Sequence, residues 1–149
     1  ARTGLKAELV AADALEWDPS RQFDAVLLDA PCSATGTFRR HPEVLHRAGR
    51  RIISESAELQ ARLLDRAAAM LNPGGVLVYA VCSLEPQEGE DSVSAFLARD
   101  SSFRIDPPGQ GELPRGVAVS PEGWVRVLPG MLEAEGGLDG FFVARLSKS

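Results

Sequence analysis

The sequence predicts an α/β protein of one domain, with a sheet that starts parallel and ends in an antiparallel strand pair. Two short apolar runs, at residues 23–28 and 76–81, have the length and composition of buried strands. An amphipathic helical pattern over residues 54–71 separates them. Two further apolar runs close the chain without a helical pattern between them. This order is typical of an α/β sheet with a mixed edge.

The first half of the chain contains two of the expected strands. Residues 7–12 are interpreted as a short strand that ends at Asp13, and residues 23–28 as a second strand. The second run is apolar at nearly every position, which favours a strand covered on both faces of a parallel sheet. Residues 37–49 are polar and basic, and we expect a connection there.

An apolar stripe and a stop signal define the central helix, residues 54–71. The stripe consists of Leu59, Leu63, Ala67, Met70 and Leu71. The Asn-Pro-Gly-Gly sequence at 72–75 ends the helix and leads into the strand at 76–81. A crossover helix of this kind normally makes the strands on either side of it parallel.

The second half of the chain predicts one more helix and the closing strand pair. Pro86 fits the first turn of a helix that has acidic residues near its positive N-terminal end and ends near Arg99. Residues 106–123 are rich in Pro and Gly and indicate a loop. Residues 124–128 and 140–146 are expected to pair antiparallel, because a short connection joins them.

Composition and charge narrow the functional classes. No apolar stretch approaches the roughly 18 residues that span a bilayer, and the N-terminus lacks a signal-peptide pattern, so we expect a cytoplasmic protein. The net charge of −5 argues against a nucleic-acid binder as a whole. Residues 39–66 nevertheless hold seven arginines against four acidic residues. This segment either binds phosphates or is a solvated helix surface with ion pairs.

The two cysteines, Cys32 and Cys82, each lie just past the carboxyl end of an expected strand. A cytosolic protein rarely keeps a disulfide, and the paired ligand spacing of a zinc site is missing. If the two strands are parallel neighbours, both thiols lie at the rim where open α/β sheets bind ligands. Asp13 and Asp29 also follow strands and are expected at this rim. Inert buried thiols are the alternative interpretation.

Four parts of the sequence resemble a known family of enzymes. DAPCSATGT (29–37), followed by RRHPE, resembles motif IV of the Sun-type (NOL/NOP/Sun) RNA cytosine-5 methyltransferases. LNPGGVLVYAVCSLEPQEGE (71–90) resembles motif VI of that family, and LDGFFVARL (138–146) its C-terminal strand. The strand end at Asp13 resembles motif III. The resemblance implies a Rossmann-like class I methyltransferase sheet.

The resemblance also implies an activity with assigned residues. The family transfers a methyl group from S-adenosyl-L-methionine to carbon 5 of cytosine in RNA, and ribosomal RNA is expected here rather than transfer RNA. Cys82 would be the nucleophile that attacks carbon 6, and Cys32 would assist release. Asp13 and Asp29 would contact the cofactor. The residues expected to contact the RNA, an unstacked single-stranded cytosine, are Asp29, Pro31, Arg39 and Arg40.

The sequence departs from the family pattern in three places. Val81 stands where the family usually has threonine, and Glu88-Gly89 where it often has Glu-Asn. No glycine-rich loop precedes Asp13. We therefore expect residues 1–149 to be one partial catalytic domain, with a sheet incomplete at its N-terminal side and without the cofactor loop or the N-terminal RNA-binding region. Such a segment would be inactive alone and could form a homodimer through its open sheet edge.

Two other functions fit parts of the sequence. A non-catalytic module with this fold could bind RNA or a protein without chemistry. An amino-group methyltransferase would carry an Asp/Asn-Pro-Pro-aromatic turn and would need no thiol. The sequence Asp-Ala-Pro-Cys at 29–32 argues against the amino-group enzyme.

Overall fold

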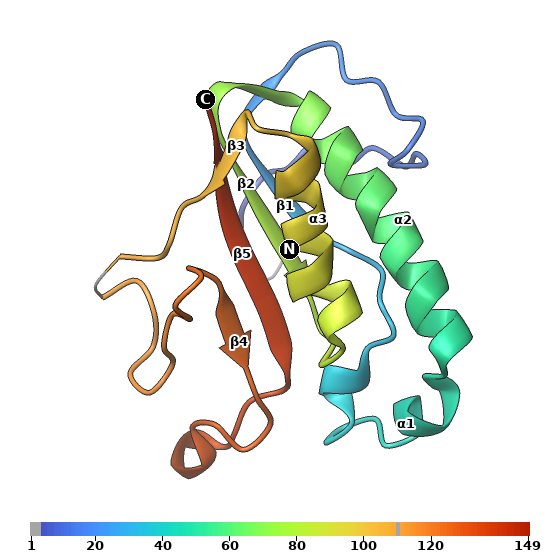
Figure 1. Ribbon diagram of the computed structural model, residues 1–149, viewed down its shortest axis with the longest axis vertical. Coiled ribbons are helices and arrows are strands. Elements are labelled where there is room, and N and C mark those ends of the chain that lie inside the picture. Colours follow the sequence, from blue (N-terminus) through green and yellow to red (C-terminus); the bar gives the residue numbers. More distant parts are fainter. Residues whose placement is uncertain (1–3, 110) are drawn as a thin grey trace.

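The computed structural model of the protein describes residues 4–109 and 111–149. Strands and helices alternate along the first two thirds of the chain, and strands predominate after that (Figure 1). The strands are β1 (Phe23–Asp29), β2 (Leu71–Val81), β3 (Phe103–Ile105), β4 (Val125–Val127) and β5 (Phe141–Lys148). The α-helices are α1 (Val44–Arg47), α2 (Arg50–Ala69) and α3 (Glu90–Arg99), and short 3-10 helices are η1 (Thr35–Thr37), η2 (Pro86–Glu88) and η3 (Glu133–Glu135).

One mixed sheet contains all five strands. β1 pairs with β2 in parallel, with Asp29 opposite Ala80. β2 pairs with β5 antiparallel, and both β3 and β4 pair antiparallel with β5. β3 lies against the last residues of β5 and β4 against its first, so the two short strands follow one another along one edge. The predicted α/β class, the parallel first pair and the antiparallel final pair are confirmed.

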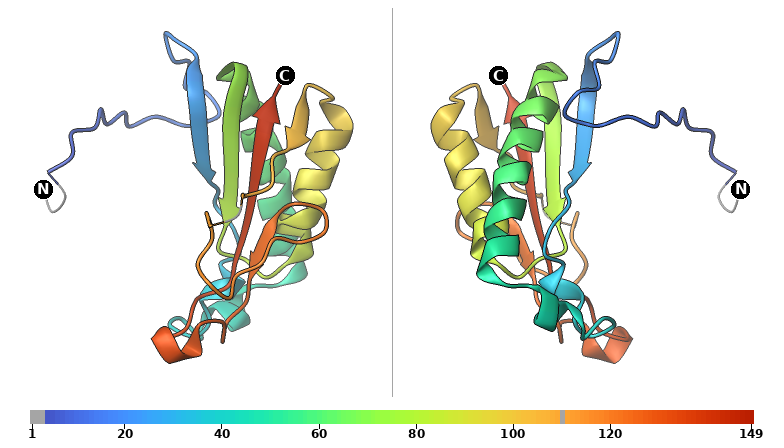
Figure 2. Two further views of the ribbon diagram at one scale, coloured as in Figure 1. Left: turned by 90° about the vertical axis from the view of Figure 1, so that its left-hand side faces the viewer. Right: turned by 90° about the vertical axis from the view of Figure 1, so that its right-hand side faces the viewer.

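Helices α2 and α3 cover one face of this sheet (Figure 2). Alternate residues of β2 and β5 point toward the helices, where they are fully buried. This core comprises Leu64, Ala67, Ala68, Val93 and Phe96 of the helices and Leu77, Tyr79, Val81, Phe142, Ala144 and Leu146 of the sheet. The intervening residues of β2 are only partly buried. Burial of one sheet face is the main favourable contribution to folding.

The prediction that residues 23–28 are covered on both faces is wrong. Leu27 of β1 is 71% exposed, and Ala25 on the same face is also exposed. Within the described residues, β1 pairs with β2 only. Both long helices pack on the opposite face, so nothing described covers Leu27. A continuous apolar run therefore marks the strand correctly but does not show that both faces are packed.

The prediction of a strand at residues 7–12 is also wrong. This segment forms no strand, and in Figure 2 the chain before β1 leads away from the sheet. Leu9 is 92% exposed and Val10 53% exposed. A strand needs a neighbour for its backbone N–H and C=O groups, and no described strand pairs with this segment.

Element boundaries shift modestly elsewhere. Helix α2 begins at Arg50, one turn before the expected start, after Gly49 in an extended conformation. β2 begins at Leu71, so the Asn-Pro-Gly-Gly sequence lies within the strand as a register irregularity. The helix predicted from Pro86 consists of η2 followed by α3, and its end at Arg99 is as predicted. The short elements α1 and β3 were not predicted.

Candidate functional site

The two cysteines meet at the carboxyl ends of β1 and β2. Their Sγ atoms are 3.5 Å apart, and both side chains are partly buried free thiols. The Ala30 N–H donates to the Ala80 carbonyl oxygen at 3.0 Å, so the two chains stay in register just before the cysteines. The expected convergence of both thiols on one rim is therefore confirmed.

The thiol pair is electrostatically asymmetric. The pKa of Cys82 is lowered to about 7, mainly because its thiolate accepts a hydrogen bond from Cys32. Burial and the negative charges of Asp29 and Glu88 oppose this lowering. The pKa of Cys32 is raised, first by the same hydrogen bond and then by burial. Near neutral pH, Cys82 is thus the better nucleophile, and Cys32 keeps its proton.

Backbone contacts lock the Cys32 loop against the rest of the rim. The Gly36 N–H donates to the Cys82 carbonyl oxygen at 3.0 Å, and the Gly140 N–H donates to the Gly36 carbonyl oxygen at 2.7 Å. A Cβ atom at position 36 would lie 2.1 Å from the Gly140 carbonyl oxygen. Ala34, at the turn into η1, has a left-handed backbone with φ of 59°. Only glycine fits at position 36 without displacing the Gly140 backbone, so the loop conformation is closely defined.

A buried polar cluster lies directly behind the thiols. Glu88 is fully buried, and its carboxylate accepts hydrogen bonds from Ser33, Ser83 and Gln60. Thr35 adds a hydroxyl 3.3 Å from that of Ser83. Sequence analysis did not single out these residues as part of the site. The repeated Cys-Ser pair at 32–33 and 82–83 was the available signal.

The predicted carboxylates occupy different places. Asp29 is exposed at the end of β1, close enough to Cys82 for its charge to raise the pKa of that thiol. Asp13 is exposed in the segment before β1, where its Oδ1 accepts the Leu15 N–H at 2.9 Å. The described contacts bring Asp29 to the thiol rim and do not bring Asp13 there.

Pro31 and the two predicted RNA-contacting arginines lie around the Cys32 loop. Pro31 is exposed, and its carbonyl oxygen accepts from Gln60 Nε2 at 2.8 Å. Arg39 donates to the carbonyl oxygens of Leu138 and Gly136 at 3.2 and 3.0 Å. Arg40 forms an ion pair with Asp139. Both arginines therefore hold the loop before β5, although the Arg40 side chain is still 66% exposed.

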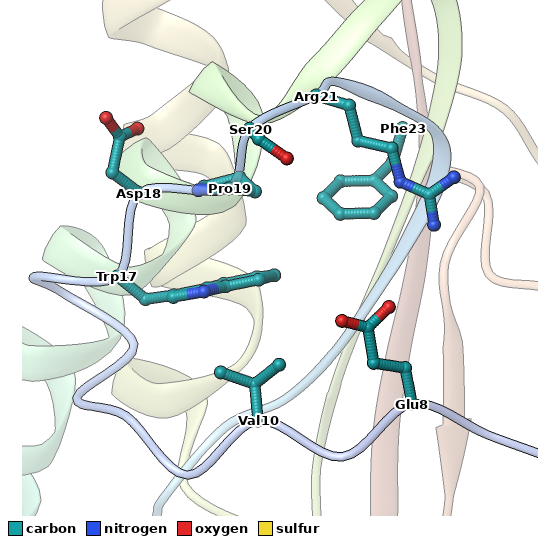
Figure 3. Close-up of a pocket in the computed structure, with 8 residues that line it drawn as sticks. All are labelled: Glu8, Val10, Trp17, Asp18, Pro19, Ser20, Arg21 and Phe23. Atoms are coloured by element: carbon teal, nitrogen blue, oxygen red, sulfur yellow. The ribbon is translucent and has the colours of Figure 1, made fainter.

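Two cavities differ in their relation to the thiols. A cavity of about 200 Å³ opens beside Cys32, between the cysteine loop, α1 and the start of α2, with Ile52 and Arg47 in its wall. A larger cavity of about 520 Å³ lies at the amino end of β1 (Figure 3). Its wall includes Trp17 and Phe23, whose ring centroids are 6.1 Å apart. The site is placed at the smaller cavity because the reactive groups are there.

Residues 4–109 and 111–149 contain neither a metal-binding cluster nor a membrane-spanning helix. No group of three or more His, Cys, Asp or Glu side chains in this part of the chain is arranged to hold a metal ion. In the same residues, no helix combines the length and apolar character needed to cross a membrane.

Comparison with known proteins identifies the family. The model of the family described as 16S rRNA methyltransferase RsmB/F matches residues 1–147. The chain belongs to this family. Ribosomal RNA small subunit methyltransferase B of Shewanella oneidensis is 43% identical over 99% of this chain. The protein of the same name from Pseudomonas syringae pv. tomato is 46% identical over 99% of this chain. The resemblance to Sun-type enzymes is thus confirmed.

Solved structures support the RsmB/F fold. NSun6 from Pyrococcus horikoshii, in a crystal structure described as containing SFG, has a TM-score of 0.77 and 30% identity. That match covers 95% of this chain and 34% of the NSun6 chain. The chain likewise spans 33% of the length of the Shewanella and Pseudomonas relatives. These matches confirm the class I methyltransferase sheet.

Proposed function

We propose that this RsmB/F segment carries the two-thiol site of an S-adenosylmethionine-dependent RNA methyltransferase that modifies carbon 5 of cytosine in ribosomal RNA. The supporting observation is the Cys32–Cys82 pair, with Sγ atoms 3.5 Å apart. The pKa of Cys82, lowered to about 7, supplies a nucleophile near neutral pH. The names of the relatives favour ribosomal RNA as the substrate.

The chemistry begins at Cys82. Its thiolate forms a bond to carbon 6 of the cytosine, and the electrons of the 5,6 double bond move toward carbon 5. Carbon 5 then has enamine character and can take a methyl group, which it could not do in the aromatic ring. A difficult step is thereby divided into two easier ones. A base must leave its stack to reach this thiol, so an unstacked cytosine is the substrate.

Release of the methylated base regenerates the Cys82 thiolate. The proton on carbon 5 leaves to a base, its electron pair restores the 5,6 double bond, and the bond from carbon 6 to sulfur breaks. Cys82 departs as a thiolate. Cys32 stabilises that thiolate by donating the same S–H hydrogen bond that lowers the pKa of Cys82 in the free site. This assigns Cys82 as nucleophile and Cys32 as the release group.

Asp29 and Asp13 are the two carboxylates proposed to contact the cofactor. S-adenosylmethionine supplies the methyl group when bound. Asp29, exposed beside Cys82, suits a cationic amino group at the methionine end of that molecule. Asp13 is held in its own turn, so its proposed role at the adenine end depends on a rearrangement of the segment before β1. The partial-domain assignment of residues 1–149 and their inactivity alone stay predictions.

The RNA contacts proposed at Pro31, Arg39 and Arg40 follow from their place beside Cys32. Both arginines are exposed, and the Arg40 side chain, which is 66% exposed, could reach a phosphate. Pairing with Asp139 must give way when a phosphate approaches. Preference for ribosomal over transfer RNA, a cytoplasmic location and a homodimer through the open edge of β1 stay predictions.

Trapping with 5-fluorocytosine tests the proposal. The protein should have the full length of its relatives and carry this segment, and the RNA should contain 5-fluorocytidine at accessible positions. Fluorine cannot leave carbon 5 as a cation, so the adduct persists. We expect a cofactor-dependent thioether at Cys82, located by peptide mass spectrometry, and none in Cys82→Ala. RNA binding that survives Cys82→Ala, with no adduct in the wild type, would instead indicate a non-catalytic binding module.

A further inference from the structure

Glu88 lies immediately behind the thiols, is 0% exposed, and bonds to both cysteine loops. We propose that Glu88 is a positioning residue that sets the separation of the Cys32 and Cys82 thiols. The inference rests on the proposed function in one respect: the separation matters to catalysis only if the thiols react with the base.

The Glu88 carboxylate uses all of its hydrogen-bonding capacity. Oε1 accepts from the Ser33 N–H at 2.8 Å and from Gln60 Nε2 at 3.2 Å. Oε2 accepts from the Ser33 and Ser83 hydroxyls, each at 2.5 Å. An ionised carboxylate offers about four acceptor positions. Because every partner is a donor, the cluster matches a carboxylate and does not match an amide.

The donors come from three separate parts of the chain. Ser33 follows Cys32 in the loop after β1, Ser83 follows Cys82 in the loop after β2, and Gln60 lies on α2. Their hydrogen bonds to one buried charge join these segments at a single point. The Tyr79 hydroxyl donates to the Glu88 carbonyl oxygen at 2.6 Å and anchors Glu88 itself to β2.

Separation of the two loops would remove the Ser33 N–H and the Ser33 hydroxyl, two of the four donors to the buried carboxylate. The nearby guanidinium of Arg126 is already engaged, since it pairs with Glu90 and donates to the Ser83 carbonyl oxygen at 2.6 Å. A buried charge that loses its partners costs more than a neutral hydrogen bond that breaks. Glu88 thus resists loop separation more strongly than the backbone contacts alone would.

This resistance acts one residue away from each thiol. The hydroxyl oxygens of Ser33 and Ser83 are 3.2 Å apart, and the Sγ atoms of the preceding cysteines are 3.5 Å apart. Consecutive Cα atoms are separated by a fixed distance of about 3.8 Å. A shift of Ser33 relative to Ser83 is therefore transmitted directly to the thiols.

The separation of the two thiols can be followed through their effective concentration, which is how readily Cys32 and Cys82 form a disulfide compared with free thiols in solution. The 149-residue chain and each variant are equilibrated with reduced and oxidised glutathione at one pH well above 7, the value near which the pKa of Cys82 lies in the wild type. Two protein thiols and one oxidised glutathione give one protein disulfide and two reduced glutathiones. We expect Glu88→Gln to lower the effective concentration by about tenfold or more, because the amide cannot accept from all four donors.

Matched variants separate positioning from general stability. Glu85→Gln makes the same charge change three residues earlier, and none of the described hydrogen bonds involves the Glu85 carboxylate; its effective concentration should equal that of the wild type. Glu88→Asp keeps the charge and should recover part of the loss. A purely structural role would lower the free energy of unfolding of Glu88→Gln and leave the native effective concentration within twofold of wild type, which would overturn the proposal.

The result does not depend on methyl transfer. If Glu88→Gln fails to fold, Ser33→Ala and Ser83→Ala remove one hydroxyl donor each, and unchanged effective concentrations in both would equally overturn the proposal. Glu88→Gln could show a large loss of effective concentration while the full-length wild type forms no RNA adduct. That result would support the positioning role and reject the proposed function. The two failures are therefore distinguishable.

Discussion

Ser33 and Ser83 lie one residue beyond Cys32 and Cys82, and their hydroxyl oxygens are 3.2 Å apart. Both hydroxyls donate to the same Glu88 oxygen at 2.5 Å. The two strand ends thus carry the same Cys-Ser pair and present it in the same way, with sulfur toward sulfur and hydroxyl toward carboxylate. The reactive pair and its support are built from adjacent residues of two loops.

Replacing Cys32 should raise the pKa of Cys82. In the wild type, the Cys32 hydrogen bond is the largest influence that lowers the Cys82 pKa to about 7. Cys32→Ala removes this donor, while burial and the charges of Asp29 and Glu88 still raise the pKa. Alkylation of Cys82 by iodoacetamide, followed against pH, should reach half its maximal rate near pH 7 in the wild type and at a clearly higher pH in the variant. An unchanged profile would show that the thiols do not interact in solution.

Neutralising Asp29 should lower the pKa of Cys82, the opposite of the effect of replacing Cys32. Its carboxylate raises the pKa of Cys82, so Asp29→Asn favours the thiolate and moves the alkylation profile to lower pH. The shift should be smaller than that caused by Cys32→Ala, because the Asp29 side chain is exposed and solvent screens its charge. Asp24→Asn, at the other end of β1, is the control and should leave the profile in place. A shift to higher pH in Asp29→Asn would contradict the geometry.

The convergence of the thiols could be predicted from sequence because it depends on topology alone. Two apolar runs joined by a long helix predict parallel neighbouring strands, and the carboxyl ends of such strands share one rim. Cys82 follows its run directly, and Cys32 lies shortly past the end of its run. No side-chain detail was needed, and a shift of one residue in either strand boundary would not have changed the result.

The role of Glu88 could not be predicted in this way. The sequence from Glu85 to Glu90 contains three acidic residues near a helix start, a pattern typical of a solvated N-terminus. Glu88 is buried because helix α2 and the loop after Cys32, more than fifty residues earlier, pack over it. The exposure of one face of β1 could not be predicted either, because it also depends on how distant parts of the chain pack. Leu27 suits a buried strand by composition, and only the arrangement of the helices decides whether that face is covered.

A methyl group at Gly36 should destabilise the cysteine loop. Its Cβ would lie 2.1 Å from the Gly140 carbonyl oxygen, and the contacted Gly140 atoms belong to the backbone and cannot move aside freely. We expect Gly36→Ala to lower the free energy of unfolding by about 1–3 kcal/mol, measured by urea titration. Gly109→Ala, where the nearest contact to a new Cβ would be 3.8 Å, is the matched control and should be nearly neutral. Equal stabilities of the two variants would show that the Gly36–Gly140 contact is looser than described.

Oxidation should join Cys32 to Cys82 and stabilise the chain. The Sγ atoms are already 3.5 Å apart, so a modest movement brings them to the bonding distance of about 2.0 Å. Because the bond closes a loop of about fifty residues, it restricts the unfolded chain and should add roughly 2–4 kcal/mol to the free energy of unfolding. Urea titration of diamide-treated protein, with and without later reduction, measures the gain. Cys32→Ala under the same treatment should show none. Intermolecular dimers in place of the internal bond would indicate that the thiols face outward rather than toward each other.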